Sequence, residues 1–133
     1  MANMSDFLEV TLLNLSLNGT SWAGMNNPYI ALYTTDPTDA DSGTEVSASG
    51  TSYARVLSSF AVASGTSGAV LSDADATWAA ATGAGFGTVG WVGLHDAATG
   101  GNLLYHTALD AAKTIDAGDI FKITTGNLSV TLA

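Results

Sequence analysis

Apolar residues recur at helical spacing near the start of the chain. Leu8, Leu12 and Leu15 follow one another at intervals of four and three residues, which places them on one face of an α-helix. Phe7, Leu13 and Leu17 widen the same stripe. The pattern predicts one amphipathic helix over residues 6–17.

Both ends of this segment carry helix-boundary signals. Asp6 can act as the N-cap, and Glu9 follows three residues later, as in a capping box. Asn18 and Gly19 can form the left-handed turn that ends a helix. A lone helix of this length is marginal in water, so it must pack on another surface. That surface is either one end of a sheet or a partner chain.

From Pro28 onward, residues 28–133 show the periodicity of strands and turns. Residues 29–35 and 88–95 are apolar on both faces, which is typical of interior strands. In the last segment Leu128, Val130 and Leu132 alternate with polar residues, which predicts one buried and one wet face. Residues 96–102 read as a hairpin connection. Further short strands are expected at 53–60, 69–71, 76–79, 103–109 and 120–124.

About eight short strands with closely spaced turns and one helix favour a mainly β fold. We predict an antiparallel β-sandwich or jelly-roll-like architecture with one N-terminal amphipathic helix. The 133 residues are expected to form a single domain, residues 1–133.

The charge composition argues against nucleic acid and anionic lipid as partners. Only Arg55, Lys113 and Lys122 are cationic, against twelve Asp and Glu, which leaves a formal net charge of −9. A nucleic-acid binder needs a basic patch, and docking on anionic lipid needs one too, so neither partner is expected. The longest apolar run is too short to span a bilayer, and the start lacks the positive region of a secretory signal. Without cysteine there is no thiolate chemistry.

The first candidate for chemistry is the acidic loop that contains Asp36, Asp39, Asp41 and Glu45. Asp39 and Asp41 are spaced as in some calcium loops, but an EF-hand pattern started at Asp39 has Gly43 at the fifth position, where a ligand is needed. A solvated acidic loop is favoured. Whether residues 36–45 bind a cation stays open at the level of sequence. Asp73 and Asp75 form a weaker acidic pair.

The two histidines are the second candidate. If Gly100 and Gly101 form a two-residue turn, His95 lies opposite His106 and Asp96 lies opposite Tyr105. Facing imidazoles could hold a metal ion, but a stable site needs a third or fourth ligand. A longer loop would shift the register and separate the pair. We interpret both residues as structural strand histidines.

The remaining motifs give no catalytic assignment. There is no Gly-x-Ser-x-Gly elbow, and no pair of carboxylates stands out for glycoside hydrolysis. The glycine loop over residues 83–87 lacks the Lys-Ser/Thr ending of a phosphate cradle. Trp78 and Trp91 lie in predicted strands and are expected in the core, whereas Trp22 lies in a loop. We expect a protein that is not an enzyme, with no catalytic, cofactor-binding or metal-binding residues and no cofactor.

Motifs in a fixed order along the chain are similar to those of a known family. They include Ser5–Glu9, Tyr29–Asp41, Gly43–Ser47, Ser52–Val56, Gly93–Leu104, Lys113–Asp119 and Gly126–Leu132. This order resembles a family of small phage virion proteins commonly labelled phage tail fibre protein, over nearly the full length. In size and predicted fold the chain also resembles capsid decoration (cement) proteins. The resemblance implies a virion structural protein.

Two virion roles fit this resemblance. The favoured interpretation is a capsid decoration protein that binds the outer capsid surface and bridges capsomers, because the chain lacks the repeats of a fibre shaft. The alternative is a short tail fibre or tail-tip knob subunit involved in host receptor binding. A carbohydrate-binding module would need exposed aromatic residues, with Trp22 and Phe86 as candidates.

The expected partners are the major capsid protein or other virion proteins and further copies of the same chain. Assembly is expected in the host cytoplasm. Residues 6–17 are the segment we expect to contact either the capsid or a sister subunit.

Overall fold

The computed structural model describes residues 2–19, 21, 27–63 and 68–132 of the chain. The fold is mainly β with one N-terminal helix, as the sequence predicts. Its elements are β1 (Asn3–Met4), α1 (Asp6–Leu17), β2 (Tyr29–Tyr33), β3 (Val56–Leu57), β4 (Ala69–Leu71), β5 (Ala76–Thr77), β6 (Gly87–His95), β7 (Leu103–Ile115), β8 (Lys122–Ile123) and β9 (Ser129–Thr131).

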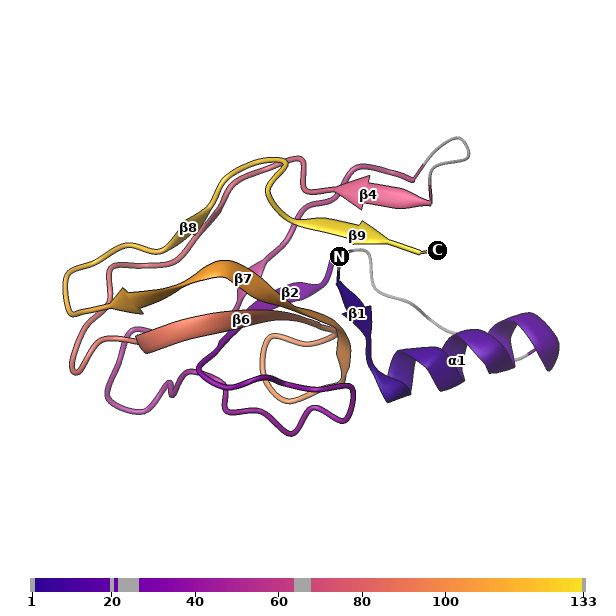
Figure 1. Ribbon diagram of the computed structural model, residues 1–133, viewed down its shortest axis with the longest axis horizontal. Helices are drawn as coiled ribbons and strands as arrows, with labels where there is room; N and C mark the ends of the chain where they lie inside the picture. The colour runs from indigo at the N-terminus through magenta and orange to yellow at the C-terminus, as the bar shows by residue number, and fades with distance from the viewer. Residues whose placement is uncertain (1, 20, 22–26, 64–67, 133) are drawn as a thin grey trace.

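Five strands form one antiparallel sheet in the order β1-β7-β6-β2-β3. The apolar segments 29–35 and 88–95 supply β2 and β6, which are both interior strands of this sheet. Each of them has a neighbouring strand on both sides, which confirms the predicted interior position. Apolar residues on both faces of a strand are stable there, because both faces are covered. Two smaller antiparallel pairs, β4-β9 and β5-β8, lie across from the sheet (Figure 1).

The core lies between the large sheet and the two small strand pairs, which makes the architecture sandwich-like. Ile30, Leu32 and Val92 project into it from the sheet, and Ala76 and Leu128 reach it from the other side. Trp78 packs edge-on against Phe121, with ring centroids 5.3 Å apart. The small pairs are therefore held mainly by this shared core, since each contributes only two or three residues of strand pairing.

Several strand limits differ from the prediction. The expected strand over 53–60 is reduced to β3, and the return strand expected over 103–109 extends to Ile115. It continues because Lys113, Thr114 and Ile115 pair with the first half of β6. Between Val89 and Trp91 the register shifts, so β7 bulges at this point. In the last strand Leu128 is buried as predicted, but Leu132 is 47% exposed.

The helix has the predicted bounds, residues 6–17, but a different cap. The N-cap is Ser5, whose Oγ accepts a hydrogen bond from the Leu8 N–H at 3.3 Å, so the capping box of Asp6 and Glu9 does not form. Ser5 also donates to the Leu103 carbonyl, and its N–H donates to the Leu104 carbonyl at 2.9 Å. The tertiary contact with β7 thus selects which residue caps the helix.

Most of the predicted apolar stripe is not covered by the protein's own sheets. Only Leu8 is buried in α1, whereas Leu13 and Leu17 are 57% and 76% exposed. Figure 1 shows why: α1 extends away from the sheets, and only its first turns lie beside β1 and β7. Within the described residues, no helix combines the length and apolar character needed to cross a membrane.

Candidate functional site

The acidic loop packs against the end of the sheet, and its carboxylates bind donors of the protein itself. Asp36 accepts from the Thr38 N–H at 3.0 Å, and Asp41 accepts from the Tyr33 hydroxyl at 2.9 Å. Asp39 lies 2.9 Å from His106 Nε2. Over the residues that the structure describes, no group of three or more His, Cys, Asp or Glu side chains could hold a metal ion.

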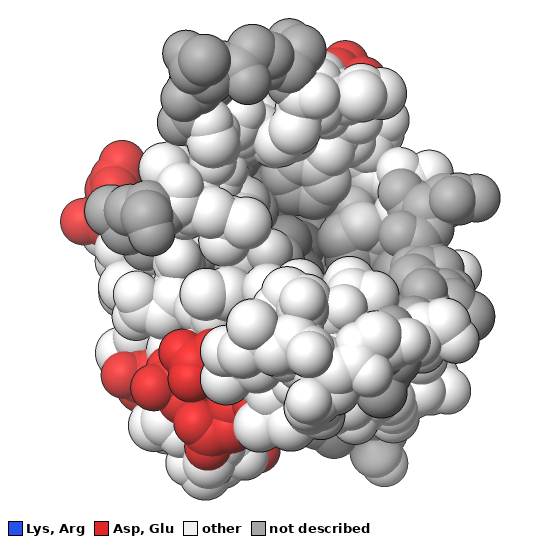
Figure 2. All heavy atoms as spheres, turned by 90° about the vertical axis from the view of Figure 1, so that its right-hand side faces the viewer, with Lys and Arg blue, Asp and Glu red and all other residues white. Residues whose placement is uncertain are grey.

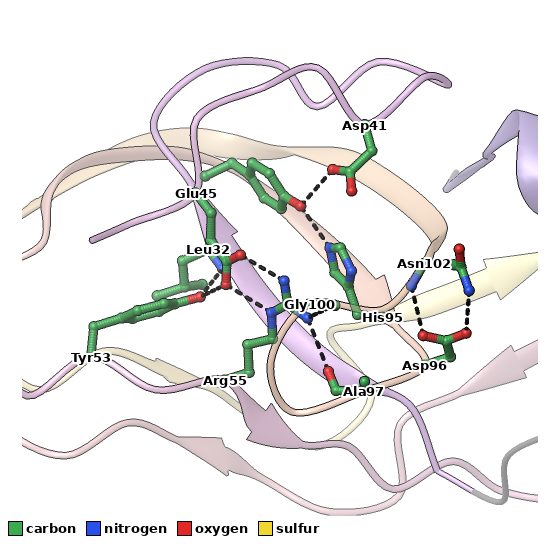
Figure 3. Close-up of polar contacts among 11 residues, drawn as sticks. Leu32, Asp41, Glu45, Tyr53, Arg55, His95, Asp96, Ala97, Gly100 and Asn102 are labelled. Atoms are coloured by element: carbon green, nitrogen blue, oxygen red, sulfur yellow. Dashed lines mark hydrogen bonds and ion pairs between the residues drawn. The ribbon is translucent and has the colours of Figure 1, made fainter. Parts of the chain in front are cut away.

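Glu45 and Arg55 form a bidentate ion pair at this end of the molecule (Figure 3). The Arg55 guanidinium donates from Nε and Nη2 to the two carboxylate oxygens of Glu45, at 2.8 and 2.7 Å. Its Nη1 donates to the carbonyls of Ala97 and Gly100 at 2.9 and 2.7 Å. The Tyr53 hydroxyl adds a third hydrogen bond to Glu45 at 2.7 Å. We call Glu45, Tyr53 and Arg55 the arginine clamp, because it ties the acidic loop to the β6–β7 hairpin.

The electrostatics of the clamp favour its charged form. Burial opposes ionisation of Glu45, but the hydrogen bonds from Arg55 and Tyr53 hold the pKa of its carboxyl below the ordinary value. Burial likewise opposes the charge on Arg55, yet Glu45 raises the pKa of the guanidinium. Burial raises the pKa of the Tyr53 hydroxyl, so this group stays a neutral donor. The pair is bidentate and mostly desolvated, which is the strong form of an ion pair.

A second polar chain lies beside the clamp. His95 Nε2 is 2.6 Å from the Tyr33 hydroxyl oxygen, and that hydroxyl is hydrogen-bonded to Asp41. Because the single hydroxyl proton goes to Asp41, the imidazole must donate from Nε2 to Tyr33. Nδ1 of His95 is then unprotonated, and it is buried with no hydrogen-bond partner in the described part of the chain. Burial and, after it, the nearby Arg55 charge lower the pKa of His95, which favours the neutral ring.

The two histidines do not face each other, because the condition for that pairing, a two-residue turn at Gly100 and Gly101, is not met. The hairpin connection spans residues 96–102, so His95 pairs with Leu103, and His106 pairs with Gly93 on one side and Asn3 on the other. For the same reason Asp96 does not lie opposite Tyr105, which pairs with Leu94.

Asp96 stabilises the hairpin connection over residues 96–102, which is longer than the two-residue turn considered from the sequence. Its carboxylate accepts from the N–H and the Nδ2 of Asn102 at 2.7 and 2.8 Å. These bonds, together with those from Arg55 to the loop carbonyls, stabilise a loop longer than two residues.

The aromatic candidates differ in burial, and Trp91 is less buried than the predicted core position implies. Trp78 is buried as predicted, and Trp91 is half-buried on β6. Phe86 is only 3% exposed and packs edge-on against Tyr53, so it is no surface platform for a sugar. Trp22 lies outside the described residues.

The glycine loop is a turn, as expected. A Cβ at Gly83 would lie 2.0 Å from the Gly50 carbonyl oxygen, so the loop packs against the chain's own backbone.

Asp75 pairs with Lys122 at 2.8 Å and accepts from Thr125. Lys122 first, and then Thr125, lower the pKa of Asp75 to about 2.

Arg55 is the residue that sequence reasoning missed. It is the only arginine of the chain, and a sole arginine among twelve carboxylates is a signal that one of them is its partner. Which carboxylate it binds depends on how the fold places the loops, because Glu45 lies ten residues earlier whereas the Ala97 and Gly100 carbonyls lie 42 and 45 residues later. Chemically the members of the clamp satisfy one another, and with the loop carbonyls they hold the loops at this end of the sheet in one arrangement.

The comparison with protein families decides what kind of molecule carries these features. A family model described as "Podophage GP4 fiber I protein gp80" matches residues 3–131. The chain belongs to this phage fibre family. The search of curated proteins produced no match. The resemblance found in the sequence motifs is therefore confirmed at the level of the family.

Membership of the fibre family makes this chain a component of the phage virion. The matched family is described as a fibre protein, which agrees better with a short tail fibre or knob subunit than with capsid decoration.

The surface around α1 is apolar and carries few charges, in contrast to the polar network of the arginine clamp. Figure 2 looks at the side where α1 projects: no Lys or Arg is visible there, and the acidic groups gather mainly toward one edge. Of the ten large hydrophobic residues that are exposed in the described chain, five lie on α1. The candidate functional surface is therefore this helix.

Proposed function

We propose that the chain is a structural subunit of a short phage tail fibre or tail-tip knob, which acts through protein contacts and not as an enzyme. Its family match over residues 3–131 carries this proposal. The exposed apolar side of α1 supports it, because exposed apolar patches mark interaction surfaces. Its partners are other virion proteins and further copies of itself, and assembly takes place in the host cytoplasm.

The arginine clamp supports a structural role in another way. A fibre tip must keep its loops in one arrangement while it contacts a cell surface. Arg55 joins three segments that are separated by many residues, namely its own, Glu45 and the carbonyls of Ala97 and Gly100. Binding surfaces on loops that a rigid scaffold positions are common in recognition proteins. The loops tied by the clamp are the part of the molecule that we assign to host contact.

The location of the chain on intact virions tests the proposal. Antibodies raised against the purified chain are expected to label the tail in electron micrographs of intact virions. An antibody against the major capsid protein is the control for labelling of the shell. Label spread over the capsid would contradict the fibre role and favour capsid decoration.

Competition for host cells tests the contact with the receptor. Purified chain, incubated with host cells before infection, is expected to slow phage adsorption, because it occupies the same receptors. A heat-unfolded sample of the same chain is the control. Unchanged adsorption together with tail labelling would leave a structural fibre subunit without a receptor-binding role.

A further inference from the structure

A groove separates β7 from β8, which pair with other strands and not with each other (Figure 1). Its volume is about 450 Å³, within the range of clefts that hold small ligands. The buried core residues Val92 and Leu128 form its floor, and the half-buried Phe121 and Ile123 line it from the side of β8. The groove therefore gives access to apolar surface at an open side of the sandwich.

The bulge in β7 shapes one wall of this groove. One residue of β6, Gly90, opposes residues 109–112 of β7. Side chains of a regular strand alternate between two faces, but residues 107–111 all line the groove. Bulges redirect side chains and are frequent beside active sites. Here the bulge brings Asp110 to the same cavity as the apolar floor.

Both lysines of the chain line the groove, Lys113 from β7 and Lys122 from β8. The third cation, Arg55, belongs to the arginine clamp, and Lys122 is paired with Asp75 at 2.8 Å. Lys113 is exposed and makes no ion pair within the part of the chain that the structure describes. The groove therefore offers an uncompensated cation, although the chain as a whole is acidic.

Acceptors for hydroxyl groups lie in the same groove. The exposed carboxylate of Asp110 forms no ion pair in the described structure. The Asn127 amide donates from Nδ2 to the Thr124 hydroxyl, which orients the amide and leaves its carbonyl oxygen as an acceptor. One cation, two acceptors and an apolar floor match a sugar ring, which carries hydroxyl groups and an apolar C–H face, together with a carboxylate.

We propose that the groove between β7 and β8 binds an acidic saccharide. Its carboxylate lies on Lys113, its hydroxyl groups donate to Asp110 and Asn127, and Phe121 and Ile123 pack against the apolar face of the ring. The formal charge of −9 permits this, because at physiological ionic strength carboxylates farther away than about 8 Å are largely screened.

An added peptide strand fits this groove less well than a saccharide does. Strand addition uses a regular edge of N–H and C=O groups, and a bulge removes that regularity. The bulge at residues 109–112 lies in the part of β7 that lines the groove. A saccharide needs no ladder of main-chain hydrogen bonds, so its binding is compatible with the bulge.

Titration of the isotope-labelled full-length chain, followed by NMR, tests the groove. The probes are trigalacturonic acid and sialyllactose, each compared with its methyl ester, which keeps the hydroxyl groups and removes the charge. Chemical-shift changes are expected at residues 107–113, 121–124 and 127–128, and the signals of the arginine clamp are expected to stay unchanged. Esterification is expected to raise the Kd about fivefold, the effect of losing an exposed ion pair.

Lys113→Gln tests the cation. It is expected to raise the Kd of both acids about fivefold and to leave the Kd of their methyl esters unchanged, a difference that misfolding would not produce. Ser16→Asp is the control, because it makes the net charge more negative by the same single unit at an exposed position of α1. Its Kd values are expected to match those of the unmodified chain.

Triglutamate, acetylated and amidated at its ends, separates a saccharide site from a site for any carboxylate. It carries three carboxylates, as trigalacturonic acid does, and is expected to bind about tenfold more weakly. The inference is overturned if triglutamate binds as tightly, or if neither saccharide gives saturable shift changes in the groove up to about 10 mM. Equal weakening by Lys113→Gln and Ser16→Asp would also overturn it.

This inference goes beyond the fibre proposal and does not rest on it. The groove contains no residue of the arginine clamp, and the titrations use the purified chain alone. Failure of the titrations leaves the position of the chain on the virion undecided, and label on the capsid would leave the titrations unaffected. The two failures are therefore distinguishable.

Discussion

Arg55 joins its own segment to acceptors 10, 42 and 45 residues away in the sequence. Its side chain is 7% exposed and binds Glu45 and two loop carbonyls at distances below 3 Å. In an acidic chain with few cations, one buried guanidinium satisfies acceptors from two loops at once. Removal of either partner leaves the other charge buried without compensation.

Arg55→Met is expected to lower the free energy of unfolding by about 2–3 kcal/mol, toward the lower end for a buried pair because Glu45 is 27% exposed. The variant leaves the Glu45 carboxylate and the carbonyls of Ala97 and Gly100 without their donor. Urea denaturation, followed by tryptophan fluorescence, measures the change.

Lys122→Met is the matched control for this variant. The pair of Lys122 with Asp75 is exposed on both sides, at 46% and 43%, and exposed pairs contribute little. Its free energy of unfolding is expected to stay close to that of the unmodified chain. Equal loss in both variants would show that Arg55 is not a special anchor.

His95 makes stability depend on pH. Burial lowers its pKa in the folded protein below the ordinary 6.5, so the unfolded chain binds the proton more readily. Stability from this residue is therefore complete above pH 6.5 and is lost as the pH falls toward the lowered folded pKa. The melting temperature is expected to fall by several degrees between neutral pH and the lowered pKa, measured by differential scanning calorimetry.

His95→Gln keeps a donor toward Tyr33 and removes the titrating ring. Its melting temperature is expected to be flat over the same range, whatever its absolute value. The stability that Glu45 contributes changes in a lower pH range, because its pKa in the folded protein is held below the ordinary 4.5. That stability is complete above pH 4.5 and is lost as the pH falls through the lowered pKa. An unchanged pH slope in His95→Gln would contradict the assignment.

At the scale of elements, the turns decide how the strands meet. The connection over residues 96–102 is longer than a two-residue turn, and this difference moves His106 away from His95. A change of loop length shifts the register of every later pair on the strand. The loop around Gly83 is similarly set by contact: it has a φ of +64° and packs against the carbonyl of Gly50.

Gly83→Ala is expected to lower the free energy of unfolding by about 2 kcal/mol or more, because both the left-handed backbone and the contact with Gly50 disfavour a side chain. Gly100→Ala is the control. Gly100 has a similar φ of +60°, but a Cβ there meets nothing within 4 Å. Its variant is expected to lose only about 1 kcal/mol. Equal losses in thermal or urea unfolding would show that the contact with Gly50 contributes nothing.

At the scale of the whole molecule, charge is unbalanced and cations are few. Three cations face twelve carboxylates, and Arg55 and Lys122 are engaged in ion pairs. Net repulsion destabilises the compact state. The surface of this fibre-family protein is thus acidic in the loops and uncharged along most of α1.

The melting temperature is expected to rise by a few degrees as sodium chloride goes from about 0.01 M to about 0.1 M, because the screening length shortens from about 30 Å to about 10 Å. Asp110→Lys removes part of the repulsion at an exposed strand position. At low salt this variant is expected to be more stable than the original chain, and the gain is expected to vanish at high salt. A melting temperature that falls with salt would mean that favourable ion pairs dominate.

Local pattern was sufficient for the helix and the main strands of this protein, although not for β1 or for the limits of β3 and β7. The bounds of α1, the interior positions of β2 and β6 and the mainly β architecture all follow from the spacing of apolar residues, because helix and strand periodicities are properties of neighbouring residues. The family resemblance also followed from motifs in their order along the chain.

Tertiary structure decided what depends on distant contacts. The N-cap moved to Ser5 because β7 offers it carbonyl acceptors, and the histidines separated because the hairpin loop is long. Arg55 and Glu45 form their ion pair because the fold brings two loops together. The sequence shows that α1 is rich in apolar residues, but only the fold decides which of them stay exposed, since this depends on how the sheet directs the helix.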